Sequence, residues 1–215
     1  AGEYLKKGRP VYVEGRLKDI INRGGEQGAQ HSQSLQSWYA HIPGLRVVMP
    51  ATVRDARDLL IAATLSPDPV LYIDDRWLYG QREDLPPPVD VDLYRIGNQI
   101  LREGSDVTLA GCSWATLLNL QAADALAGNG ISAEVVDCRI LNPFDRGPLV
   151  NSVAKTGRLL AVDGSWATCG MSAEILASAV EGVAPAAWKS TPKRIALADS
   201  RTPRETVLSE RRGFG

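Results

Sequence analysis

The sequence predicts an α/β protein, and two observations carry that prediction. Short apolar runs typical of buried strands alternate with helical segments over residues 44–75, and the alternation returns over residues 106–199. This alternation is the signature of a parallel α/β layer. Between the two series, residues 80–92 read GQREDLPPPVDVD, with three consecutive prolines and several acids. Such a segment favours extended, exposed chain and therefore predicts a linker between two α/β units.

The first series contains two strands and two helices that follow one another closely. Residues 34–42 and 52–65 have helical spacing, whereas residues 44–50 and 69–75 are short apolar runs expected to be buried on both faces. Thr52 precedes an apolar stripe of helical period, so we expect it to be the N-cap of the second helix.

The second series is long enough to form an open α/β domain by itself. The expected strands cover 106–112, 131–137, 158–165 and 193–199, and the expected helices cover 113–130, 142–157 and 170–182. We expect Ser113 to cap the first of these helices. The run DDR at 74–76 is expected to be a solvated strand end.

Composition excludes several classes of function. Lys and Arg total 24 against 25 acidic residues, a formal charge of −1, so no overall field would attract nucleic acid or an anionic membrane. Neither a signal peptide nor an apolar run long enough to span a bilayer is present. The three widely spaced cysteines fit reduced core thiols. We therefore expect a soluble, cytoplasmic protein.

One histidine stands out as a candidate for chemistry. His31 directly follows the glycine-rich turn GGEQGAQ, which itself follows a buried strand, and ligands of α/β sheets bind beyond the carboxyl ends of strands. An imidazole there could transfer a proton near neutral pH. The structural alternative is a histidine that caps the next helix or satisfies a buried carbonyl. His41, at a helix end before Pro43, fits an interaction with the helix dipole.

From about Ile20 onward the order of motifs resembles the β-type subunits of thiamine-diphosphate-dependent 2-oxo acid dehydrogenases, the decarboxylating components of the pyruvate, branched-chain and acetoin complexes. The motifs are AQHSQSLQSWYAHIPGLRVVMPAT, DARDLLIAA, DPVLYIDDRWLYG, VVDCRILNPFD and LLAVDGSWATCGMSAEI. The resemblance implies the C-terminal part of a pyrimidine-binding domain followed by a transketolase C-terminal-like open α/β domain. The expected segments are a foreign-looking helix–strand unit at 1–19, the truncated pyrimidine-binding domain at 20–80, a linker at 81–92 and the C-terminal domain at 93–215.

The same resemblance implies a role for His31 and a set of partners. In the family the histidine of HSQ faces the substrate carbon bound to the thiazolium ring. Thiamine diphosphate and Mg²⁺ are shared with an α-type decarboxylase subunit, and the acyl group passes to lipoyl groups of an acyltransferase core. The C-terminal domain implies a homodimer. The whole protein would decarboxylate a 2-oxo acid oxidatively, with an α-type partner required.

A potassium site is also implied by the resemblance. In several relatives a loop binds the ion through main-chain oxygens, here near Ala63, Thr64, Ser66 and Asp68. Ser66 and Pro67 stand where the family usually has Asp-Asn, and this departure counts against the ion.

Two further departures leave the enzymatic status open. The family's cofactor-activating glutamate lies in a region that precedes Ile20, so the chain is expected to be truncated and inactive alone. Residues 1–18 resemble a segment of bacterial single-stranded DNA-binding proteins, which suggests a chimera. The alternatives are a non-catalytic dimerisation or complex-assembly module and, less favoured, a single-stranded DNA binder, which the charge balance and the missing aromatic platform oppose.

Overall fold

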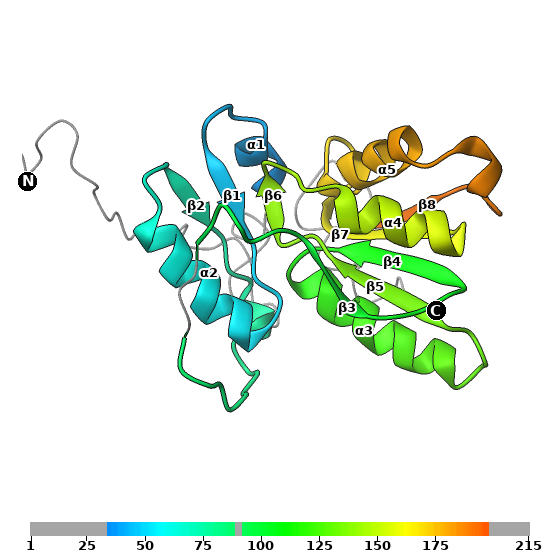
Figure 1. Ribbon diagram of the computed structural model, residues 1–215, viewed down its shortest axis with the longest axis horizontal. Helices are drawn as coiled ribbons and strands as arrows, with labels where there is room; N and C mark the ends of the chain where they lie inside the picture. The colour runs from blue at the N-terminus through cyan, green and yellow to red at the C-terminus, as the bar shows by residue number, and fades with distance from the viewer. Residues whose placement is uncertain (1–33, 89–91, 198–215) are drawn as a thin grey trace, which may run out of the picture.

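The computed structural model describes residues 34–88 and 92–197. His31, the foreign-looking segment at 1–19 and the end of the chain lie outside the described residues. The elements, shown in Figure 1, are α1 (Gln36–Ala40), β1 (Arg46–Val48), α2 (Val53–Leu65), β2 (Val70–Tyr72), η2 (Arg76–Leu78), β3 (Gln99–Arg102), β4 (Val107–Gly111), α3 (Trp114–Ala127), β5 (Ala133–Asp137), β6 (Ile140–Asn142), α4 (Gly147–Thr156), β7 (Leu159–Trp166), α5 (Met171–Gly182), η3 (Pro185–Ala187) and β8 (Lys193–Leu197).

These strands form two sheets, which confirms the predicted α/β class. The smaller sheet has the order β2-β1-β6, with β1 parallel to β2 and antiparallel to β6. The larger has the order β3-β5-β4-β7-β8, parallel except for β3. Helix α3 covers one face of the larger sheet, and α4 and α5 cover the other (Figure 1). The crossover from β4 to β5 runs one way across the sheet, and the crossovers from β5 to β7 and from β7 to β8 run the other way. Because parallel crossovers are right-handed, this reversal places their helices on opposite faces.

Two strands were not predicted from the sequence. Strand β3, at the sheet edge, and strand β6, inside the run expected to be loop and helix, have only four and three residues. Segments this short show no recognisable hydrophobic period. They form strands because they pair with neighbouring strands in the folded chain. β6 follows the proline-rich segment in sequence yet pairs with β1 before it, and the smaller sheet therefore joins both parts of the chain.

The largest hydrophobic cluster also joins the two sheets. It includes Val47 of β1, Met49 directly after it, Val136 from β5 and Ala161 from β7, all at most 4% exposed. Helices α4 and α5 add Leu149 and Ile175 among other buried side chains. Burial of this apolar surface is the main favourable contribution to folding, and it fixes the first part of the chain against the second.

Local expectations were met at some positions and not at others. Thr52 is the N-cap of α2, with its Oγ1 accepting from Asp55 N at 3.1 Å. Ser113 precedes α3, but its side chain makes no capping hydrogen bond and its φ is +54°. Cys112 and Cys138 are buried as expected, whereas Cys169 is exposed, contrary to the expectation of a core thiol.

None of the helices that the structure describes is both long enough and apolar enough to span a bilayer.

Candidate functional site

His31 lies outside the described residues, but the helix that follows it is described. Helix α1 begins at Gln36, five positions after His31, and the Gln36 side chain is buried. Its Nε2 donates to Asp163 Oδ1 at 3.3 Å, although the two residues are 127 positions apart. The start of α1 is therefore attached to β7 in the larger sheet.

Asp163 connects three segments through its two oxygens. Oδ1 accepts from Ser165 N at 3.0 Å as well as from Gln36, and Oδ2 accepts from Ser172 N at 2.8 Å in the first turn of α5. A carboxylate is favourable at a helix N-terminus because the unpaired N–H groups and the helix dipole are positive there. This side chain, only 4% exposed, orients α1, the end of β7 and the start of α5 together.

The junction lies at the topological switch point of the larger sheet. The chain leaves β4 toward β5 on one side and later returns to β7 on its other side, and open α/β sheets bind ligands in the crevice at such points. Here the hydroxyls of Ser165 and Ser172 are buried and have no hydrogen-bond partner among the described residues. A Cβ on Gly170 would lie 2.6 Å from Ser165 Oγ. The protein's own atoms therefore fill this part of the crevice.

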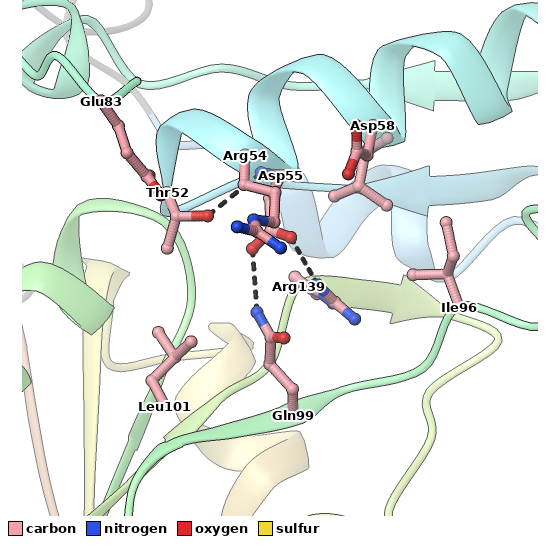
Figure 2. A pocket seen from close by; sticks show the side chains of 10 residues that line it. Thr52, Arg54, Asp55, Asp58, Glu83, Ile96, Gln99, Leu101 and Arg139 are labelled. Atoms are coloured by element: carbon pink, nitrogen blue, oxygen red, sulfur yellow. Dashed lines mark hydrogen bonds and ion pairs between the residues drawn. The ribbon is translucent and has the colours of Figure 1, made fainter. Parts of the chain in front are cut away.

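A cavity of about 340 Å³ lies between α2 and β3 (Figure 2). Ten side chains line it: Thr52, Arg54, Asp55, Asp58, Leu59, Glu83, Ile96, Gln99, Leu101 and Arg139. On one wall, Asp55 forms an ion pair with Arg139 and accepts a 2.9 Å hydrogen bond from Gln99 Nε2. Arg139 Nε also donates to Gly97 O at 2.8 Å. The polar wall is thus built from groups that pair with one another.

The network continues inward to a buried carboxyl group. Gln99 Nε2 also lies 3.3 Å from Asp137 Oδ2, and Thr116 Oγ1 donates to Asp137 Oδ1 at 2.8 Å. Burial raises the pKa of Asp137 to about 7, partly opposed by the hydrogen bond from Thr116. Asp137 therefore keeps its proton up to near neutral pH. Its hydrogen bonds with Gln99 and Thr116 give it a structural role.

A second buried carboxyl group corrects the expectation for the DDR run. Asp75 is 5% exposed rather than solvated, and its Oδ1 accepts from Trp77 N at 2.9 Å at the start of η2. Burial raises its pKa to about 6. Asp74 is exposed, as expected.

The structure brings the four residues of the implied potassium loop together. Ala63 and Thr64 lie in the last turn of α2, Ser66 is its C-cap, and Asp68 follows in the turn before β2. The Asp68 carboxylate is bound by Arg46 and Tyr94. Within the described ranges, no group of three or more His, Cys, Asp or Glu side chains is arranged to hold a metal ion.

Several of these residues carried no signal in the sequence. Gln36 and Arg139 lie within motifs of the family resemblance, but the motifs assign them no role, and their contacts depend on partners 127 and 84 positions away. Asp163 could have been noticed, since it interrupts the apolar run LLAV. Asp55 lies in the first turn of the helix that Thr52 caps. Acidic residues are common at helix starts, so the sequence did not indicate its ion pair with Arg139.

Comparisons with known proteins agree with this architecture. The family described as "Transketolase, C-terminal domain" matches residues 98–212, more than half of the chain, and the family "Transketolase, pyrimidine binding domain" matches residues 18–81. Among solved structures, "Split gene transketolase, inactive beta4 tetramer" aligns with a TM-score of 0.66 at 25% identity, over 85% of this chain and 58% of the other.

Three curated relatives have related names. "Pyruvate dehydrogenase E1 component subunit beta-2, mitochondrial" of Oryza sativa subsp. japonica is 45% identical over 72% of this chain and 42% of its own length. "2-oxoisovalerate dehydrogenase subunit beta 2, mitochondrial" of Arabidopsis thaliana is 38% identical over 73% and 44%. "Pyruvate dehydrogenase E1 component subunit beta" of Rhizobium meliloti (strain 1021) is 40% identical over 68% and 32%. The chain thus spans less than half the length of these relatives.

The relatives also correct one prediction from the sequence. A cytoplasmic location was expected, but the similar proteins of Oryza sativa and Arabidopsis thaliana are named as mitochondrial. The bacterial relative carries no such word in its name. Cysteine usage and the lack of an apolar segment do not distinguish one reducing compartment from another, and the cytoplasmic prediction is therefore wrong as it was made.

Proposed function

The chain belongs to the transketolase family through its C-terminal domain, and from that premise we propose that it is part of a β-type subunit of a thiamine-diphosphate-dependent 2-oxo acid dehydrogenase. The observation that carries the proposal is the 38–45% identity to β subunits named for pyruvate and 2-oxoisovalerate dehydrogenases. The match of residues 18–81 to a pyrimidine-binding domain supports it. The reaction is oxidative decarboxylation of a 2-oxo acid with transfer of the acyl group to a lipoyl group.

In this proposal the chain contributes the pyrimidine side of a shared cofactor site. Thiamine diphosphate, when bound, supplies the carbanion that attacks the substrate carbonyl, and the diphosphate and its Mg²⁺ belong to an α-type partner. His31 acts as the proton-transferring imidazole at the substrate. The link from Gln36 to Asp163 supports this role, because it attaches a residue five positions beyond His31 to β7 of the larger sheet. Contacts to a lipoyl acyltransferase core and a homodimer through the C-terminal domain complete the proposed assembly.

We propose the domain division at 20–80, 81–92 and 93–215, with 1–19 as a segment of different origin. The two family matches, at 18–81 and 98–212, support these boundaries. The pairing of β6 with β1 adds that the two units share a sheet.

The decisive experiment combines the purified chain with α-type subunits of pyruvate and of branched-chain dehydrogenases. We expect no turnover of any 2-oxo acid by the chain alone, and thiamine diphosphate binding by calorimetry when a matching α-type subunit is present. In an active complex, H31A should lower turnover by about 10²- to 10⁴-fold, the usual loss on removing a proton-transferring group. The matched control H41A removes the other histidine and should retain most turnover.

Each other outcome has a defined meaning. Turnover by the isolated chain contradicts the proposal, as does failure to bind either α-type subunit. Association without cofactor binding or turnover supports the alternative of a non-catalytic assembly module. A salt-dependent shift of a single-stranded oligonucleotide would instead favour the DNA-binding alternative.

A further inference from the structure

The turn between α2 and β2 is closed by contacts within the protein. Ser66 Oγ accepts from Asp68 N at 3.2 Å, which closes the turn locally. Arg46 N, at the start of β1, donates to Pro69 O at 3.0 Å, which fixes the turn to the neighbouring strand. The turn is therefore held in place before any ion is considered.

Three side chains at this turn each contact the other two. Arg46 Nε and Asp68 Oδ2 are 2.9 Å apart, Tyr94 OH donates to the same Asp68 oxygen at 2.8 Å, and the Arg46 guanidinium carbon lies 4.1 Å from the centre of the Tyr94 ring. A charge-assisted hydrogen bond and a cation–π contact thus share one guanidinium. We call Arg46, Asp68 and Tyr94 the arginine clamp.

The clamp keeps the Asp68 carboxylate ionised and neutralises its charge. The hydrogen bonds from Arg46 and then Tyr94 lower the pKa of Asp68, and the bond to Asp68 raises the pKa of Tyr94. The Arg46 side chain is only 14% exposed, so its charge is fixed at the turn.

The turn's side-chain oxygen atoms are already paired, and the turn already carries a positive charge from Arg46, so it is a poor site for a potassium ion. A hard cation requires several oxygen atoms that are free to converge on it in a region of negative potential. The carboxylate of the turn is already paired with a guanidinium, and Ser66 Oγ and Pro69 O already accept hydrogen bonds. The main-chain carbonyls of Ala63 and Thr64 lie at the negative end of α2, whose last turn has no basic residue, so this end of the helix favours a positive charge nearby. Arg46, bound to Asp68 of the same turn, supplies that charge. A second cation beside Arg46 would be repelled by it.

We propose that the arginine clamp takes the place of the potassium ion at the α2–β2 turn, so that the chain's own guanidinium stabilises a turn held by a cation in several relatives. The clamp also reaches beyond the proline-rich segment, because Tyr94 follows it in sequence whereas Arg46 and Asp68 precede it. It therefore fastens the two parts of the chain together. This inference does not depend on catalytic activity and is tested on the chain without a partner.

The experiment measures the thermal midpoint of the full chain in KCl, NaCl and tetramethylammonium chloride at equal ionic strength. We expect the same midpoint in all three salts. R46Q should lower the midpoint in each salt, and Y94F, which removes one hydroxyl from a half-exposed residue, should lower it by less. R95Q is the matched control, since Arg95 is the next residue, its side chain is 88% exposed, and its ion pair with Asp92 is local; its midpoint should not change.

Two results would overturn the inference. One is a saturable rise in the midpoint of the unaltered chain that occurs with KCl and not with NaCl. The other is a set of midpoints in which both R46Q and Y94F equal the parent. Should R46Q fail to fold, Y94F and the salt comparison on the parent still decide the question. A potassium-specific rise that appears only in R46Q would support it, because removing the guanidinium would then open the turn to an external cation.

Discussion

Asp55 and Arg139 lie 84 positions apart in the sequence and form a largely buried ion pair on the wall of the cavity between α2 and β3. Asp55 belongs to the first turn of α2, and Arg139 directly precedes β6, which pairs with β1. The pair therefore connects the two parts of the chain at the point where they share a sheet (Figure 2).

We predict that D55N destabilises the protein by about 3 kcal/mol, at the low end of the range for breaking a buried pair. The substitution keeps the size of the side chain but leaves the Arg139 charge without its counterion. Arg139 is 16% exposed, so water relieves part of the cost. Urea unfolding followed by circular dichroism measures the change in the free energy of unfolding.

The matched control is D58N, on the same helix and also lining the cavity. Asp58 pairs with the adjacent Arg57, and the side chains are 18% and 25% exposed, respectively. We expect a loss of about 0.5 kcal/mol, typical of a partly solvated pair. Equal losses for the two variants would contradict a special role for the Asp55–Arg139 pair.

Asp137 should make stability fall as the pH rises. Its pKa is raised to about 7 in the folded state from 3.8. Between these values the folded chain holds a proton that the unfolded chain has released, so the free energy of unfolding decreases by up to about 1.4 kcal/mol per pH unit. D137N removes this contribution. In urea unfolding from about pH 5 to about pH 8, the free energy of unfolding of D137N should rise relative to that of the parent as the pH rises.

Asp75 contributes a slope of the same sign up to its pKa of about 6 and is present in both proteins. The comparison with D137N cancels it. Parallel profiles for the parent and D137N over this range would show that Asp137 is ionised in the folded protein.

The stacked rings of Trp77 and Trp114 should couple η2 to α3. Their centroids are 5.6 Å apart with an angle of 26° between the planes. Aromatic pairs of this kind contribute about 0.5–1.5 kcal/mol beyond the area they bury. A double-mutant cycle of W77L and W114L should return a coupling of that size. A control cycle of W38L and W114L should return no coupling, because the Trp38 side chain is 73% exposed. A coupling energy of zero between W77L and W114L would contradict the stacking interaction.

Gly170 should be intolerant of a side chain, whereas Gly164 should tolerate one. A Cβ on Gly170 would lie 2.3 Å from Trp166 O and 2.8 Å from Asp163 Oδ2, but a Cβ on Gly164 meets no atom within 4 Å. We expect G170A to lose about 1–3 kcal/mol through overpacking and G164A to change by less than about 0.5 kcal/mol. Thermal unfolding distinguishes them, and a G170A variant as stable as the parent would show that the junction around Asp163 can open.

Local signals were sufficient for much of the fold. Apolar runs predicted β1, β2, β4, β5, β7 and β8, and helical spacing with the Thr52 cap predicted α2. These features depend on residues within one element, where backbone geometry sets the period of burial, and they can be derived before the chain is folded. The motifs that follow Ile20 likewise predicted the transketolase family correctly. The role of His31 stays a prediction, since that residue lies outside the described part of the chain.

The amino-acid sequence alone was enough to predict the α/β class, the order of the main elements and the family. Other features became visible only in the folded chain: β6 pairs with β1, Asp55 pairs with Arg139, Gln36 binds Asp163, and Arg46 and Tyr94 both bind Asp68. The physical reason is that a polar side chain buried on folding must find a partner. Which partner it finds depends on segments that packing brings together from distant parts of the chain, and no local period records that choice.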